Sequence, residues 1–209
     1  MKGLFITFEG VDGSGKSTQM ALLATRLEEL GLPVLQTREP GGPPIAEAIR
    51  HLLLDTANSA MLPRTELLLY CASRAQHTGE WIIPALKAGK IVLCDRYYDS
   101  TFAYQGAARS LDMEQIRILT DFATFHTVPN LTFLLDIPVS EGMARIGKRT
   151  LDRLELEDNS FRELVRAEYQ NLAKKNPERF VVLDGRLSRS TIHAQIIDTV
   201  LTRLGVSSD

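Results

Sequence analysis

The stretch GVDGSGKS, residues 10–17, restricts the possible folds of this chain more than any other part of its sequence. It fits the pattern G-x-x-x-x-G-K-[ST], and it lies between an apolar run at 4–8 and a segment with helical apolar spacing. In that context the glycines let backbone N–H groups turn inward onto phosphate oxygens, and the start of the helix adds positive charge. We therefore predict a nucleotide-phosphate site in which Lys16 contacts the β- and γ-phosphates and Ser17 binds Mg²⁺.

Short apolar runs alternate with longer helical patterns along the whole chain. The expected strands are 4–8, 32–37, 90–94, 131–137 and 179–184. Strand–helix alternation predicts an α/β fold of the P-loop NTPase type, with a parallel five-stranded sheet and helices on both faces. We see no repeat, low-complexity tract or linker, so we predict one domain over residues 1–209.

The charge balance excludes several classes of protein. With 24 basic and 26 acidic residues the formal net charge is −2, which argues against a general nucleic-acid or membrane-surface binder. No stretch approaches the ~18 apolar residues of a membrane helix, and the N-terminus lacks a signal-peptide pattern. Cys71 and Cys94 lie in apolar surroundings, typical of buried thiols in a reducing compartment. We therefore predict a cytoplasmic protein.

Polar residues follow the expected strands at the edge where ligands of such sheets bind. Arg38 opens TREPGG after the second run, and Asp95 and Arg96 follow the third within CDRYYDSTFAYQG, residues 94–106. Guanidinium groups at one edge are suited to bidentate phosphate binding. Arg50, on the helical pattern PIAEAIRHLLLD, is equally typical of a solvated surface charge.

Tyr70 and Arg74 are four residues apart in a helical pattern, so they lie on one face. A ring there can stack on a base while the guanidinium group reaches the base edge. Spacing alone favours the alternative, in which Tyr70 belongs to the core and Arg74 extends over it.

The polar segment at about 145–158 carries Arg145, Arg149 and Arg153 at intervals of four. If the segment is helical, all three face one way. A charge run of this kind is usually a solvated face. The alternative is a lid that brings an arginine to a transferring phosphoryl group.

The phosphate loop is shared by GTPases, motor ATPases and small-molecule kinases. No N/T-K-x-D guanine motif occurs, although Asp95 matches the second acid of a motor ATPase. None of the four histidines follows an expected strand, so no general base is apparent. An ionised phosphate monoester needs none. The pattern favours a nucleoside monophosphate kinase over a regulatory ATPase or GTPase.

Six segments in the same order resemble the bacterial thymidylate kinase family. They are FEGVDGSGKST (8–18), TREPGG (37–42), LLLYCASR (67–74), CDRYYDSTFAYQG (94–106), LDRLE (151–155) and the F…VRAEYQNLA run (161–173). The resemblance implies a homodimer that uses ATP and Mg²⁺ to phosphorylate dTMP to dTDP. It also implies an ATP-binding loop made of Gly10, Val11, Asp12, Gly13, Ser14, Gly15, Lys16, Ser17 and Thr18.

The same resemblance implies residue roles. Tyr70 would stack on thymine, Arg74 would bind its edge, Arg96 would bind the dTMP phosphate, and Tyr104 would crowd the sugar 2′ position. The full implied dTMP site is Arg38, Arg50, Tyr70, Arg74, Arg96, Ser100, Thr101, Tyr104 and Gln105. Metal binding would involve Ser17, Asp12 and Asp95. Some family members carry a basic residue where this chain has Gly13, which directs attention to lid arginines. The implied catalytic residues are Lys16, Asp12, Arg96, Arg149 and Arg153.

Overall fold

The computed structural model describes residues 3–147 and 151–206. Five parallel strands form one sheet in the order β2-β3-β1-β4-β5. Their bounds are β1 (Leu4–Glu9), β2 (Val34–Arg38), β3 (Ile91–Asp95), β4 (Leu131–Asp136) and β5 (Phe180–Asp184). Every expected strand is confirmed to within two residues at each end.

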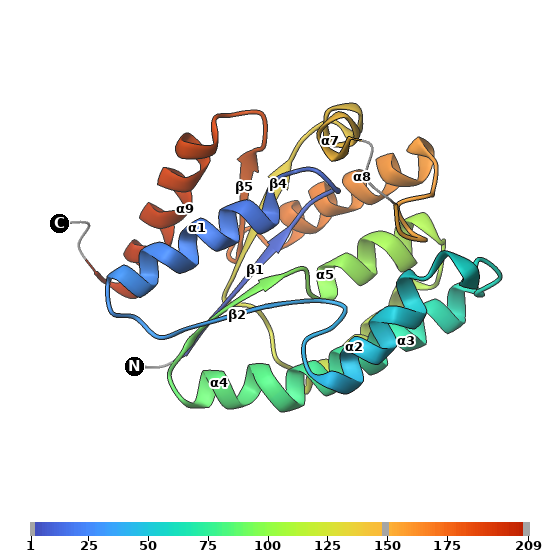
Figure 1. The fold of residues 1–209 in the computed structure, drawn as a ribbon, viewed down its shortest axis with the longest axis horizontal. Coiled ribbons are helices and arrows are strands. Elements are labelled where there is room, and N and C mark those ends of the chain that lie inside the picture. The colour runs from blue at the N-terminus through green and yellow to red at the C-terminus, as the bar shows by residue number, and fades with distance from the viewer. Residues whose placement is uncertain (1–2, 148–150, 207–209) are drawn as a thin grey trace.

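Helices connect successive strands and cover both faces of the sheet (Figure 1). The α-helices are α1 (Lys16–Glu29), α2 (Pro44–Leu54), α3 (Pro63–His77), α4 (Ile83–Lys87), α5 (Tyr98–Thr101), α6 (Met113–Thr124), α7 (Val139–Ile146), α8 (Asn159–Lys175) and α9 (Arg189–Leu204). A short 3₁₀ helix, η1 (Thr56–Asn58), and two π-helical segments, η2 (Thr78–Ile82) and η3 (Phe102–Ala108), are the other helical elements of the described residues. The predicted fold class is confirmed.

The apolar spacing seen in the sequence explains which helices pack together. Leu23 and Leu27 of α1 and Ile192 and Ile196 of α9 are buried against one face of the sheet. The opposite face is covered by α8 and η3, where Val165 is buried. Because the central strands are covered on both sides, their runs are continuously apolar rather than alternating.

The lid segment differs from its helical expectation. Helix α7 ends at Ile146, and residues 151–158, all described, form turns rather than a helix. Gly147 ends the helix with φ of 69°. Arg145 and Arg153 therefore do not share one helical face, and Arg149 lies outside the described residues. The condition for a shared face, one helix through the segment, is therefore not met at 151–158.

None of the helices in the described ranges combines the length and the apolar character needed to cross a membrane.

Candidate active site

A cleft of about 760 Å³ opens at the carboxyl ends of the strands and brings most of the predicted site residues together. From the predicted set it is lined by Asp12, Gly13, Ser14, Gly15, Lys16, Ser17, Thr18, Arg38, Arg50, Tyr70, Arg74, Asp95, Arg96, Ser100, Thr101, Tyr104 and Gln105. Gly10 and Val11 belong to the loop but not to the lining, and Arg153 lies away from it. The cleft joins the phosphate loop at one end to an arginine- and tyrosine-rich region at the other.

The phosphate loop needs its glycines for conformation and for space. Gly10 and Gly13 have φ of 138° and 76°, in the region that side chains disfavour. A Cβ atom on Gly13 would collide with the carbonyl oxygen of Gly142, at the middle of α7. The loop then feeds directly into α1, whose first residue is Lys16. The helix N-terminus therefore points its free N–H groups at the cleft.

Lys16 occupies the floor of this loop. Its Nζ donates to the carbonyl oxygens of Gly10 and Val11, both at 3.0 Å, and the residue is 6% exposed. Burial, followed by the neighbouring Arg96 charge, lowers the pKa of Lys16 to about 8. The amine is thus held where phosphate oxygens would meet it, and a bound anion would stabilise its charge.

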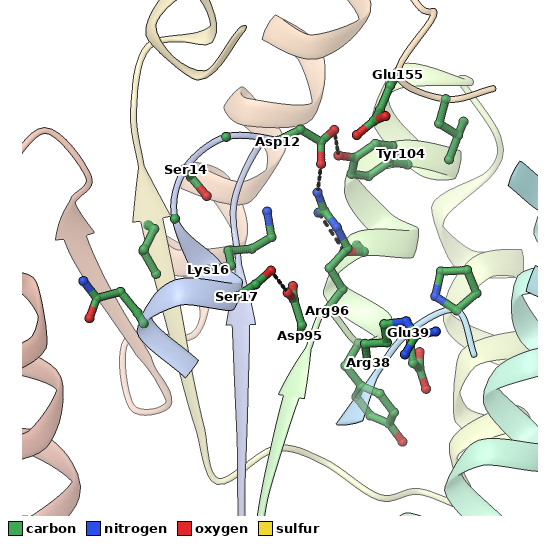
Figure 2. Close-up of a pocket in the computed structure, with 18 of the residues that line it drawn as sticks. Asp12, Ser14, Lys16, Ser17, Arg38, Glu39, Asp95, Arg96, Tyr104 and Glu155 are labelled. Atoms are coloured by element: carbon green, nitrogen blue, oxygen red, sulfur yellow. Dashed lines mark hydrogen bonds and ion pairs between the residues drawn. The ribbon is translucent and has the colours of Figure 1, made fainter. Parts of the chain in front are cut away.

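Ser17 and Asp95 meet beside the loop. The Ser17 hydroxyl donates to the Asp95 carboxylate, which ends β3 (Figure 2). Two oxygen ligands next to a phosphate site, with phosphate oxygens and water completing an octahedron, are the donor set that Mg²⁺ prefers. These residues therefore fit a magnesium ion.

Arg96 lies at the junction of the two ends of the cleft. Its backbone has φ of 70°, which turns the chain out of β3. Its Nη2 donates to Asp12 Oδ1 at 2.5 Å, and its Nη1 donates to the Gly10 carbonyl at 3.1 Å and to Tyr169 Oη at 3.0 Å. Figure 2 shows the Asp12 carboxylate between Arg96 and Tyr104. Arg96 is thus held by contacts from several sides. The carboxylate of Asp12 points toward the arginine- and tyrosine-rich end of the cleft.

A buried carboxyl group lies beneath Arg96 that no sequence motif singled out for a role. Glu9, fully buried, accepts hydrogen bonds from the Tyr97 backbone N–H at 2.8 Å, Ser100 Oγ at 2.7 Å and Tyr169 Oη at 2.8 Å. Burial, followed by the charge of Asp99, raises the pKa of Glu9 to about 7. An acid ending an apolar strand was the available signal for Glu9. Tyr169, on α8, lies in the matching run 161–173, but that run was given no residue roles.

Arg74 is buried and held by a carboxylate from β2's end. Its Nε donates to Glu39 Oε2 at 2.7 Å, and Glu39 also pairs with His77 Nδ1 at 3.0 Å. The residue is 2% exposed, and its Nη1 is enclosed without a hydrogen-bond partner among the described residues. Tyr70, one turn earlier, is half-buried and lines the cleft. The alternative in which Arg74 extends over a core tyrosine is therefore not observed.

Arg38 and Arg50 line the same region. Arg38, about half exposed, donates from Nη2 to both carboxylate oxygens of Glu47, at 2.9 and 3.1 Å. Arg50 donates from Nη1 to the Pro40 carbonyl oxygen at 2.7 Å. Burial lowers the pKa of Arg50, and the nearby Arg38 charge adds to that. Both guanidinium groups border the cleft, so Arg50 is more than a solvated surface charge.

Arg153 is engaged away from the phosphate loop. It is 7% exposed, its Nη1 pairs with Glu66 Oε2 at 2.7 Å, and its Nε donates to the Leu53 carbonyl at 2.8 Å. Contact with a transferring phosphoryl group would require these bonds to break. Arg145, by contrast, lines the cleft and donates from Nη1 to the Gly185 carbonyl at 2.9 Å.

A parallel α/β sheet, a phosphate loop and a cleft leading to an arginine-rich acceptor region together define a P-loop phosphotransferase. Comparison with known proteins agrees with this class. A family model described as thymidylate kinase matches residues 8–196.

The relatives carry the same name. A thymidylate kinase from Geotalea uraniireducens is 51% identical over 209 residues, covering 97% of this chain and 98% of that protein. One from Trichlorobacter lovleyi is 49% identical, covering 97% and 99%. The crystal structure of thymidylate kinase from Ehrlichia chaffeensis is 35% identical with a TM-score of 0.78, covering 96% and 99%. The chain belongs to the thymidylate kinase family and is therefore a phosphotransferase.

Proposed function

We propose that this protein transfers the γ-phosphoryl group of ATP to dTMP, forming dTDP. The main support for this proposal is that one cleft is lined both by the phosphate loop and by Arg96, Arg74 and Tyr70. A GTPase or regulatory ATPase needs only the donor end of such a cleft. A second end, lined by Arg38, Arg96 and Tyr70, suits a planar, anionic acceptor.

Catalysis in this arrangement depends on positioning and charge rather than on a base. The acceptor phosphate is already ionised, so Arg96 needs only to orient it in line with the transferring group. Lys16 and the loop N–H groups hold the donor phosphates and stabilise charge as it develops. Ser17 and Asp95 would hold Mg²⁺, which would neutralise negative charge on the donor oxygens.

We propose from the sequence that one lid arginine supplies a further cation to the transferring phosphoryl group in the transition state. Arg149 keeps that role because Arg153 is paired with Glu66 and Arg145 with the Gly185 carbonyl. Removing a cation that acts only in the transition state lowers kcat and leaves both KM values near the wild-type level.

Acceptor-dependent ADP release tests the proposal. A coupled assay with dTMP, dUMP, dCMP, dAMP, dGMP and thymidine should give ADP fastest with dTMP and none with thymidine. ADP release that is independent of any acceptor would identify a nucleotide hydrolase instead. Preference for another monophosphate would keep the reaction class and change the substrate.

Tyr104 is proposed to select deoxyribose. Its ring lies 5.2 Å from the Arg96 guanidinium carbon and packs against Phe161 with a centroid distance of 6.1 Å, so it cannot easily move aside. Tyr104→Ala should narrow the preference for dTMP over ribothymidine monophosphate by roughly tenfold or more, measured as a ratio of kcat/KM values. Tyr104→Phe keeps the ring and should keep the preference. An unchanged ratio in the alanine variant would remove Tyr104 from the sugar site.

We also propose a homodimer. Ile118 and Phe122 of α6, with Phe125 and Val128 after it, are between 54% and 82% exposed, an unusual group for a monomer surface. Phe122→Arg should therefore shift the mass measured by light scattering from two chains towards one. A dimer of unchanged stability in this variant would place the interface elsewhere.

A cytoplasmic location is proposed on chemical grounds. Cys71 and Cys94 are buried free thiols. Burial raises the pKa of both, so they remain protonated and unreactive in a reducing compartment.

A further inference from the structure

The amide of Gln105 is oriented by a carboxylate behind it. Gln105 lies on η3, lines the cleft and is 1% exposed. Its Nε2 donates to Glu66 Oε1 at 2.8 Å. A carboxylate accepts hydrogen bonds and donates none, so the NH₂ end of the amide must face Glu66. The carbonyl end must then face the other way.

That carbonyl oxygen is available to a ligand. Among the described residues no protein group donates to Gln105 Oε1, and the oxygen is not one of the enclosed, unpartnered atoms. Since Gln105 lines the cleft, the oxygen presents a hydrogen-bond acceptor there. A flipped amide would present two donors instead and would leave Glu66 facing an oxygen.

Glu66 is itself fixed by two cations. It is 1% exposed on α3, one turn before Tyr70. Arg153 Nη1 contacts Glu66 Oε2 at 2.7 Å, and Arg109 donates from Nη2 to Oε2 at 3.3 Å and from Nε to Oε1 at 3.4 Å. The Arg153 contact is the shorter and is buried on both sides, so it restrains the carboxylate, and the orientation imposed on Gln105, even without Arg109.

The cleft therefore offers an acceptor at Gln105, and Arg74 lines the same cleft. Thymine and uracil carry an N3–H donor beside the O4 acceptor. Cytosine carries the reverse pair, with an N3 acceptor beside a 4-amino donor. Against the Gln105 oxygen a 4-oxo base places its N3–H donor, whereas cytosine places an acceptor there, and buried polar groups left unmatched are costly.

We propose that Glu66 is a specificity-determining residue that selects 4-oxo over 4-amino pyrimidine monophosphates by fixing the amide orientation of Gln105. It acts through Gln105 and does not touch the substrate, so it is a positioning residue. The proposal rests on the proposed function. Under that function, the acceptor end of the cleft discriminates 4-oxo from 4-amino pyrimidines.

Glu66→Gln tests this directly. A glutamine side chain can either accept or donate a hydrogen bond, so it no longer fixes which end of the Gln105 amide faces it. The ratio of kcat/KM for dTMP over dCMP should fall by at least about tenfold in the variant. The ratio for dTMP over dUMP should stay within about twofold, since both bases present the same N3–H and O4. Affinities for the three monophosphates, measured by calorimetry, should move in the same pattern even if turnover falls.

The matched control is Arg109→Met, which removes one cation from Glu66 and keeps the carboxylate against Gln105. It should retain the dTMP over dCMP ratio. If Glu66→Gln does not fold, the double variant Glu66→Gln with Arg109→Met removes the excess buried charge and takes its place. In a Gln105→Ala background, Glu66→Gln should have no further effect on the ratio.

Each outcome is decisive. An unchanged ratio in Glu66→Gln, or an equal fall in Arg109→Met, would overturn the proposal. So would a fall in the dTMP over dUMP ratio of the same size, because it would indicate general loosening of the site. A wild-type protein that phosphorylates no pyrimidine monophosphate would instead refute the proposed function.

Discussion

Lys16→Ala should leave the protein folded and lower kcat by about 10³-fold or more. The amine is 6% exposed in the phosphate loop and donates to two loop carbonyls, so it is positioned before any nucleotide binds. Such a preorganised cation stabilises charge on the transferring group without reorganising during the reaction. Steady-state turnover with saturating ATP and dTMP measures the effect.

Circular dichroism and thermal unfolding provide the control for Lys16→Ala, because the variant keeps the glycines that shape the loop. A variant that retained half of the wild-type turnover would contradict the assignment of this loop to the donor.

Arg96→Ala should raise the KM for dTMP, lower kcat, and leave the affinity for ATP nearly unchanged. Charge-assisted hydrogen bonds contribute about 1.5–3 kcal/mol each, so loss of a bidentate contact predicts a fall in kcat/KM of about 100-fold or more. The variant also leaves Asp12 without the guanidinium group that contacts it at 2.5 Å, which adds negative charge where the acceptor phosphate must bind.

Arg117→Ala is the matched control for Arg96. Arg117 lies on α6, where it forms exposed pairs with Glu114 and Asp121, and its removal should change neither kinetic constant. If Arg96→Ala kept the wild-type KM for dTMP, the many contacts of Arg96 would be structural and the acceptor phosphate would bind elsewhere.

Local patterns predicted the sheet and the donor end of the cleft. The strand containing Phe5 and Phe8 is continuously apolar because both of its faces are covered, and that property is visible in the residues themselves. The phosphate loop is a contiguous motif, and the positive φ angles of its backbone require glycines. The four-residue interval of Tyr70 and Arg74 correctly indicated a shared face.

Contacts between distant residues could not be predicted in the same way. Glu9 and Tyr169 are 160 positions apart and meet only because α8 packs under the carboxyl end of β1. Glu66 has no motif of its own, and its partners come from two other segments of the chain, η3 with its C-cap and the turns at 151–158. The spacing of Arg153 was misleading for a related reason. The regular interval between the charges suggested one continuous helix, but Gly147 ends α7 before Arg153.

The carboxylate behind Arg74 has a consequence for how such a protein can diverge. Glu39 is 2% exposed and shares its charge between Arg74 and His77, whose Nε2 in turn contacts Thr37 Oγ1 at 2.7 Å. Replacing Arg74 alone would strand a buried anion, a change that destabilises proteins by about 3–5 kcal/mol. A lineage that replaces Arg74 must therefore alter Glu39 as well, and each single step passes through a less stable intermediate. Epistasis of this kind makes the Arg74 position resistant to drift.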